Sequence, residues 1–158
     1  MILDSRICTF NGVLLNSHVL NLKFLTSSLQ MGRLKNKVAI VTGAGQGIGL
    51  EICRQLATEG ACVLLNDIEK EVAEEAAHSI QKNYGKCISL AGDASSLVFI
   101  QYLVDEAVKH SCKIDIAMAN VGITLFGDFF DYRPEDFNQV MKVNLRGGFF
   151  LRSPQHNR

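Results

Sequence analysis

A glycine-rich run between two regularly patterned segments most constrains the fold of this chain. Residues 42–49 read Thr-Gly-Ala-Gly-Gln-Gly-Ile-Gly and follow directly on the apolar run Val-Ala-Ile-Val at 38–41. A continuous, β-branched apolar run is typical of a strand buried on both faces of a sheet. Glycines permit a tight turn out of such a strand and close packing of the following helix. The run therefore predicts a strand, a turn and a helix whose free N–H groups can receive a pyrophosphate.

Short apolar runs continue to alternate with helix-period segments along the chain. Strands are expected at 38–41, 62–65, 87–91 and 114–119, and helices from Gly47, around 72–80, after Ser95 or Ser96, and from Pro134. The first helix is expected to bury a stripe of Ile48, Ile52 and Leu56. Alternating strands and helices with right-handed crossovers form a parallel sheet covered on both faces. We therefore predict an α/β fold: a Rossmann-type, doubly wound parallel sheet in three α/β/α layers, with its C-terminal strands missing.

Asp67, at the end of the second expected strand, indicates which dinucleotide would bind. A carboxylate in this position accepts hydrogen bonds from the ribose hydroxyls of adenosine and repels a 2′-phosphate. The glycine turn contains no Arg or Lys, and Gln46 stands where a basic residue would favour a phosphate. NAD is therefore the expected cofactor, with NADP less favoured. The structural alternative for Asp67 is a helix N-cap.

The spacing Thr-Gly-x-x-x-Gly-Ile-Gly resembles the short-chain dehydrogenase/reductase family, and further landmarks agree. Residues 33–43 are similar to that family's opening, Gly92-Asp93 to its adenine-contacting acid, and 119–122 (Ala-Asn-Val-Gly) to its Asn-Ala-Gly element. The cofactor contacts that the resemblance implies are Gly43, Gln46, Gly47, Ile48, Gly49, Asp67, Asp93, Ala94, Asn120 and Gly122. Two structural alternatives stay open: Asp93 as a turn residue, and Asn120 as a hydrogen-bonding support of the sheet.

Asn144 is the candidate catalytic residue. It shares a helical stripe with Phe137, Val140 and Met141, so it is a polar side chain on an apolar face. A buried amide in that position must find hydrogen-bond partners. The resemblance matches Asn144 to the family asparagine that completes a Ser-Tyr-Lys-Asn set by holding a water beside the lysine.

The other members of that set are missing from this sequence. Hydride transfer at a carbonyl or alcohol carbon needs a general acid or base at the substrate oxygen. The family uses a tyrosine whose pKa is lowered by a lysine four residues later, and none of the three tyrosines here has that lysine. We therefore expect an NAD(P)-dependent oxidoreductase of a secondary alcohol or ketone, truncated before its catalytic pair. The alternative is a catalytically inactive half-domain that binds a dinucleotide or a protein partner.

Three segments are expected along the chain. Residues 1–30 lack a clear period and are interpreted as a non-family extension before a start at Met31. Residues 31–151 would form the N-terminal half of an NAD(P)-binding Rossmann domain that normally has roughly 250 residues. Residues 152–158 are interpreted as an aberrant tail. Full-length relatives are expected to be homo-oligomers, and the substrate stays open among acyl-carrier ketones, steroids, sugars and simple alcohols.

Composition excludes several other functions. Sixteen Lys and Arg residues balance sixteen Asp and Glu residues, so no net charge favours nucleic acid or an anionic membrane. No apolar run reaches the roughly eighteen residues of a membrane span. The five cysteines lack metal-ligand spacing, and the four histidines form no cluster, so no metal site is expected. We interpret the cysteines as small buried residues of a reduced compartment, the cytoplasm.

Overall fold

The computed structural model describes residues 7–10, 13–16, 32–111 and 113–152. In the first of these parts, β1 (Ile7–Phe10) pairs antiparallel with β2 (Val13–Asn16). The sequence pattern predicts no element there, so this hairpin is a difference from expectation. The proposed start at Met31, the rest of the expected extension and the tail after Arg152 lie outside the described residues.

Four parallel strands form the main sheet, as the apolar runs predict. They are β3 (Val38–Thr42), β4 (Cys62–Asp67), β5 (Cys87–Ala91) and β6 (Ile116–Ala119). Their order is β5-β4-β3-β6, so the chain moves outward from β3 and then returns to its other side. Every residue of β3 is buried, which is why its sequence is apolar without alternation.

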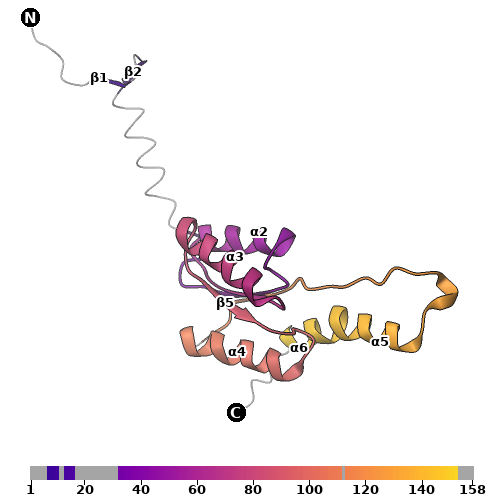
Figure 1. The fold of residues 1–158 in the computed structure, drawn as a ribbon. Coiled ribbons are helices and arrows are strands. Elements are labelled where there is room, and N and C mark those ends of the chain that lie inside the picture. Colours follow the sequence, from indigo (N-terminus) through magenta and orange to yellow (C-terminus); the bar gives the residue numbers. More distant parts are fainter. Residues whose placement is uncertain (1–6, 11–12, 17–31, 112, 153–158) are drawn as a thin grey trace, which may run out of the picture.

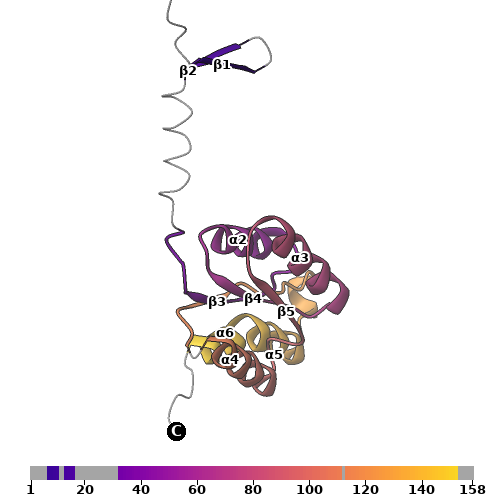
Figure 2. The same ribbon diagram turned by 90° about the vertical axis from the view of Figure 1, so that its left-hand side faces the viewer.

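Helices cover both faces of the sheet (Figures 1 and 2). On one face lie α2 (Gly47–Thr58) and α3 (Lys70–Asn83). On the other lie α4 (Leu97–Ser111), α5 (Pro134–Met141) and α6 (Gly148–Arg152). This arrangement confirms the predicted three-layer, Rossmann-type α/β fold.

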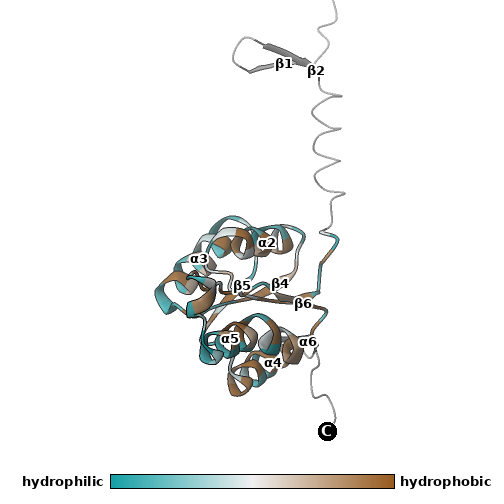
Figure 3. Cartoon of the chain, turned by 90° about the vertical axis from the view of Figure 1, so that its right-hand side faces the viewer, coloured by the Kyte–Doolittle hydropathy of each residue, from teal (hydrophilic) through white to brown (hydrophobic). Residues whose placement is uncertain are grey.

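Each face of the sheet has its own apolar core, and the strands between them carry the apolar colour in Figure 3. On the α4 face, Ile100, Leu103 and Ala107 are buried three and four positions apart. On the α3 face, Ala73 and Ile80 are buried. These stripes form because residues three and four positions apart share one side of a helix.

The predicted buried stripe of α2 is wrong by one position. Its buried residues are Gly49, Cys53 and Ala57, whereas Ile48 is 78% exposed. Small side chains face the sheet because the start of α2 lies close to the end of β3: a Cβ on Gly49 would lie 2.5 Å from the Gly43 carbonyl oxygen. The larger Ile52 and Leu56 are partly buried and pack against the same core. Hydrophobicity alone selects the larger residues, so it misplaces the stripe.

The single helix expected from Pro134 is interrupted. A π-helical segment, η2 (Lys142–Gly147), separates α5 from α6. Within the described chain, α5 buries none of its residues, and Phe137, Leu145 and Phe149 are each more than half exposed. β6 forms one edge of the sheet, and its Met118 and Ala119 are also exposed. Among the described residues, nothing apolar covers the exposed part of β6 or the exposed apolar side chains of residues 134–152.

Two described cysteines behave as small core residues. Cys53 and Cys87 are buried free thiols, and burial raises the pKa of each to about 12. Cys62 is partly buried, Cys112 lies outside the described residues, and the described part of the chain contains no cluster of His, Cys, Asp or Glu that could hold a metal ion. Among the described helices, none has the length and apolar character needed to cross a bilayer.

Truncation of Leu64 should test the central packing. Leu64 is fully buried in β4, so Leu64→Ala should lower the free energy of unfolding by about 2–5 kcal/mol through lost transfer energy and a cavity. Val98→Ala is the control, because Val98 is 83% exposed on α4 and should change stability by less than about 0.5 kcal/mol. Urea unfolding measures both. Equal unfolding midpoints for the two variants would contradict the burial of Leu64 in the core.

Candidate functional site

The carboxyl ends of the four strands bring the predicted residues to one edge of the sheet. The glycine turn follows β3, Asp67 ends β4, Asp93 follows β5 and Asn120 follows β6. The strand order reverses between β3 and β6, and such a switch point opens a crevice outside the carboxyl ends of a doubly wound sheet. The geometry of the fold therefore places the candidate site here.

The glycine turn needs residues without side chains for two separate reasons. Gly43 and Gly47 have φ angles of +61° and +60°, in the left-handed region that other residues rarely adopt. Gly49 has an ordinary φ but no room, since a Cβ there would lie 2.5 Å from the Gly43 carbonyl oxygen and 2.6 Å from Asn120 Nδ2. The turn is thus fixed both by backbone conformation and by close packing.

The N-terminus of α2 is open toward solvent. Gln46, its N-cap residue, makes no capping hydrogen bond with its side chain in the described structure, and no acidic residue stands in the first turn. Gln46, Gly47 and Ile48 are exposed. The first N–H groups of a helix lack intrahelical partners and carry partial positive charge. This helix end therefore offers donors to an anionic group such as a pyrophosphate.

Asp67 is bound to the glycine turn rather than acting as the N-cap of α3. Its Oδ2 accepts a hydrogen bond from the Gly45 backbone N–H at 2.9 Å, and its Oδ1 accepts one from Glu69 N–H at 3.3 Å. The N-cap of α3 is Glu69. A carboxylate has about four acceptor sites, so Asp67 keeps capacity for ribose hydroxyls. Its orientation is set by the turn itself.

Asp93 and Ala94 are held between β5 and the π-helical segment. Asp93 Oδ1 accepts a hydrogen bond from Ser95 N–H at 2.8 Å. Hydrogen bonding from Ser95, together with the positive charges of Lys142 and Arg146, lowers the pKa of Asp93 below its usual value. Ala94 is buried, and a Cβ on Gly147 would lie 2.3 Å from its carbonyl oxygen. Asp93 is therefore an exposed, ionised acceptor on a fixed backbone.

Asn120 has a structural role in this geometry. Its Nδ2 donates to the Gly43 carbonyl at 2.7 Å, and its backbone N–H donates to Thr42 Oγ1 at 3.3 Å. These bonds tie the end of β6 to the turn after β3. Gly122 follows two residues later, exposed, with Asn144 Oδ1 3.6 Å from where its Cβ would stand. Gly122 and Asn144 thus lie close to each other.

The expectation that the Asn144 amide is buried is wrong. Asn144 is exposed because the apolar residues of its helical face are themselves uncovered in the described chain. Its amide is nevertheless hydrogen-bonded at both ends: Oδ1 accepts from Ile123 N–H at 2.8 Å, and Nδ2 donates to the Ile123 carbonyl at 2.9 Å. Asn144 lies inside η2, and π-helical turns are frequent at functional sites.

Two residues that sequence reasoning missed also shape this edge. A Cβ on Gly45 would lie 2.6 Å from Val72 Cγ1 and 2.8 Å from Asp67 Oδ2, so the Asp67 contact needs glycine there. Asn66 is a buried amide whose contacts reach β5. The available signal was a polar residue in the otherwise apolar run 63–66.

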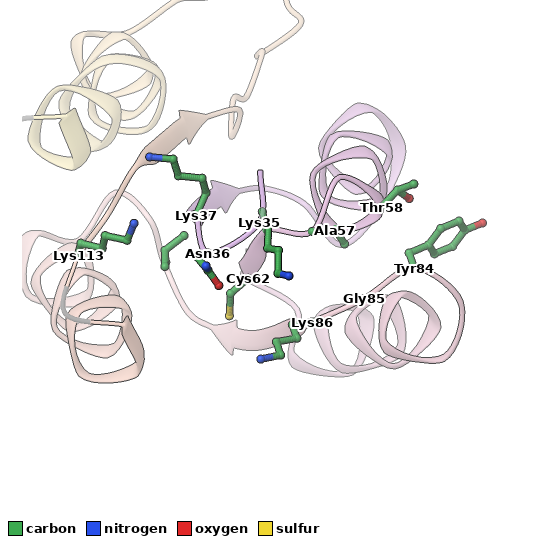
Figure 4. A pocket seen from close by; sticks show the side chains of 13 residues that line it. Lys35, Asn36, Lys37, Ala57, Thr58, Cys62, Tyr84, Gly85, Lys86 and Lys113 are labelled. Carbon is green, nitrogen blue, oxygen red and sulfur yellow. The ribbon is translucent and has the colours of Figure 1, made fainter. Parts of the chain in front are cut away.

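A cavity of about 640 Å³ lies at the opposite, amino-terminal end of the strands (Figure 4). Lys35, Lys37, Lys86 and Lys113 are among the residues that line it. Asp115 accepts ion pairs from Lys37 at 2.8 Å and from Lys113 at 3.2 Å. Lys86 and Lys113 come just after the ends of α3 and α4, where cations complement the helix dipole. Lys37, Lys86 and Lys113 therefore have a structural explanation.

Fold and site together define a Rossmann-type α/β protein with a glycine turn at a helix N-terminus. Over residues 37–153 the chain matches the family model for short chain dehydrogenase. It is 40% identical over 125 residues to elsinochrome reductase 1 of Elsinoe fawcettii, a match covering 78% of this chain and 47% of that protein. It is 40% identical over 126 residues to versicolorin reductase stcU of Emericella nidulans, covering 79% and 48%.

Solved structures agree with these sequence matches. NAD⁺-bound xylitol dehydrogenase is 33% identical, with a TM-score of 0.71, over 77% of this chain and 47% of that one. A metagenomic short-chain oxidoreductase in complex with NADP is 29% identical, with a TM-score of 0.72, over 76% and 55%. The chain belongs to the short-chain dehydrogenase family, whose members bind nicotinamide dinucleotides. It spans about half the length of the curated relatives that it matches.

Alanine substitutions should distinguish the two reasons why the turn needs glycine, which are backbone conformation and close packing. Gly49→Ala should lower the free energy of unfolding by up to about 3 kcal/mol, since its Cβ meets backbone and a bonded amide. Gly47→Ala should lower it by about 1 kcal/mol, from backbone strain in open space. Gly127→Ala, whose nearest neighbour would be Tyr132 at 3.9 Å, is the control. Chemical denaturation gives the order, and a harmless Gly49→Ala would refute the close contact.

Proposed function

We propose that residues 31–151 form the N-terminal half of a nicotinamide-dinucleotide-binding domain, and that this half binds NAD in preference to NADP. The observation that carries the proposal is the hydrogen bond from Gly45 N–H to Asp67. It holds a carboxylate beside the turn where the adenosine ribose of a dinucleotide would lie. A 2′-phosphate in that place would meet a fixed negative charge.

The remaining parts of the edge suit the rest of a dinucleotide. The uncapped N-terminus of α2, with Gln46, Gly47 and Ile48, would receive the pyrophosphate. Asp93 would accept a hydrogen bond from the adenine amino group, and Ala94 would contact the adenosine. Asn120 and Gly122 lie on the side toward Asn144, where the nicotinamide half would reach. Gly43 and Gly49 serve by allowing the close approach of strand, turn and helix.

For the whole protein we propose hydride transfer between nicotinamide and a secondary alcohol or ketone. The two matched fungal relatives are named as reductases, which supports the reductive direction. Asn144 would complete the catalytic set by holding a water beside the lysine. Its side chain is fixed by two hydrogen bonds to the backbone of Ile123. A Tyr and Lys four residues apart would supply the acid, and residues 1–158 contain no such pair.

Removing the charge of Asp67 while keeping its acceptor oxygen should test the cofactor preference. Asp67→Asn retains an oxygen for Gly45 N–H, so the turn should persist while the negative charge is lost. The ratio of the NADP and NAD dissociation constants should fall about tenfold, equivalent to about 1.4 kcal/mol. Calorimetric titration of both dinucleotides with the full chain measures this ratio.

Asp115→Asn is the matched control. Asp115 also accepts a backbone N–H, from Val38 at 2.9 Å, but it lies at the opposite end of the sheet. It should therefore leave the ratio unchanged even where stability falls. An unchanged ratio in Asp67→Asn would overturn the NAD preference. Absence of binding to either dinucleotide by the wild-type chain would overturn the binding function itself, and turnover by this chain would overturn the assignment of acid chemistry to a Tyr–Lys pair.

A further inference from the structure

Asn66 is a buried amide at the carboxyl end of β4. It is 1% exposed, and the preceding residues of the strand, Val63–Leu65, are fully buried and apolar. Burial of an amide costs free energy unless its groups are hydrogen-bonded. Asn66 lies directly before Asp67, at the candidate site.

The amide nitrogen of Asn66 reaches across to the end of β5. Nδ2 lies 2.9 Å from the Leu90 carbonyl oxygen, 3.0 Å from that of Gly92 and 3.2 Å from that of Asp67. Carbonyl oxygens only accept hydrogen bonds, so a donor is required at this point. The two shortest contacts use both hydrogens of the amide, and both lead to β5 and the turn after it.

These contacts extend beyond the ladder of the sheet. Pairing between β4 and β5 ends at Asp67 and Ala91, so Gly92 and Asp93 lie past the last paired residues. Gly92 is held there by the Asn66 amide and by its own N–H, which donates to the Asp67 carbonyl at 2.9 Å. The backbone carbonyl of Asn66 accepts a hydrogen bond from Ala44 N–H at 2.8 Å. One residue thus joins the glycine turn, the end of β4 and the turn that carries Asp93.

We propose that Asn66 is a positioning residue for the adenosine half of the bound dinucleotide. By fixing Gly92 against Asp67, it sets the separation of the Asp67 and Asp93 carboxylates that would bracket ribose and adenine. This inference rests on the proposed dinucleotide-binding function. In this proposal Asn66 does not contact the ligand, and it acts through the two turns that it connects.

The test replaces the donor by an acceptor of the same shape. Asn66→Asp in the full chain should raise the dissociation constants of NAD and of AMP at least tenfold, with unchanged stoichiometry of binding by the folded fraction. AMP reports on the adenosine half directly. A purely structural role would reduce the folded fraction, and hence the stoichiometry, without changing the dissociation constant.

Gln81→Glu is the matched control. The Gln81 amide donates to the Cys87 carbonyl at 2.7 Å, so it also bonds a side-chain amide to β5, but at the other end of that strand. This variant should bind NAD and AMP like the wild type. Equal weakening by both variants, or wild-type affinity in Asn66→Asp, would overturn the inference.

Hydrogen exchange gives a second readout that needs no ligand. Loss of the Asn66 donor should speed exchange of the Gly92 and Ser95 amides, which belong to the Asp93 turn, and leave the amides of β3 protected. Unchanged exchange at the turn would overturn the positioning role. Where Asn66→Asp fails to fold, Asn66→Ser, which keeps one donor and adds no charge, is measured in the same way. If the wild-type chain binds no dinucleotide, the proposed function fails, whereas the exchange result still decides whether Asn66 holds the turn.

Discussion

The candidate site depends on the close contact between the glycine turn and the end of β6. Asn120 donates its amide to the Gly43 carbonyl at 2.7 Å, and Gly49 leaves the space that this contact occupies. Because α2 starts within that contact, the direction of its N-terminus follows from it. The Asp67 carboxylate then bonds to the same turn through Gly45 N–H. A side chain at Gly49 would displace the turn, the helix and the carboxylate together.

The two ends of the sheet carry different charged and polar groups. Helix N-termini and exposed backbone donors meet at the carboxyl end, where an anionic cofactor is favoured. The helices end at the other side, where Lys86, Lys113 and Lys35 gather around a cavity. There Lys37 and Lys113 form ion pairs with the Asp115 carboxylate. The lysines therefore gather at the end of the sheet opposite to the candidate site.

Much of the fold and part of the site follow from local sequence. The four strands and the buried stripes of α3 and α4 were predictable because apolar period and burial coincide in them. Asp67 was predictable at the end of its strand, and the family resemblance selected Asn120. The hydrogen bonds between Asn120 and Gly43 and between Asp67 and Gly45 were not predictable, since each joins residues distant in sequence. Gly45 and Gly49 are needed because a side chain would collide with neighbouring atoms, and these neighbours are known only from the tertiary structure.

The sequence by itself determined the succession of strands and helices along the chain, the position of the glycine turn and the family. These properties reside in periodicity and in short motifs, which are local. The tertiary structure decided that Cys53 rather than Ile52 faces the sheet, that Asn144 is exposed within a π-helical segment, and that Asn66 links β4 to the Asp93 turn. The physical reason is that burial and hydrogen bonding depend on which distant segments meet, and pairwise contacts of that kind have no local signature.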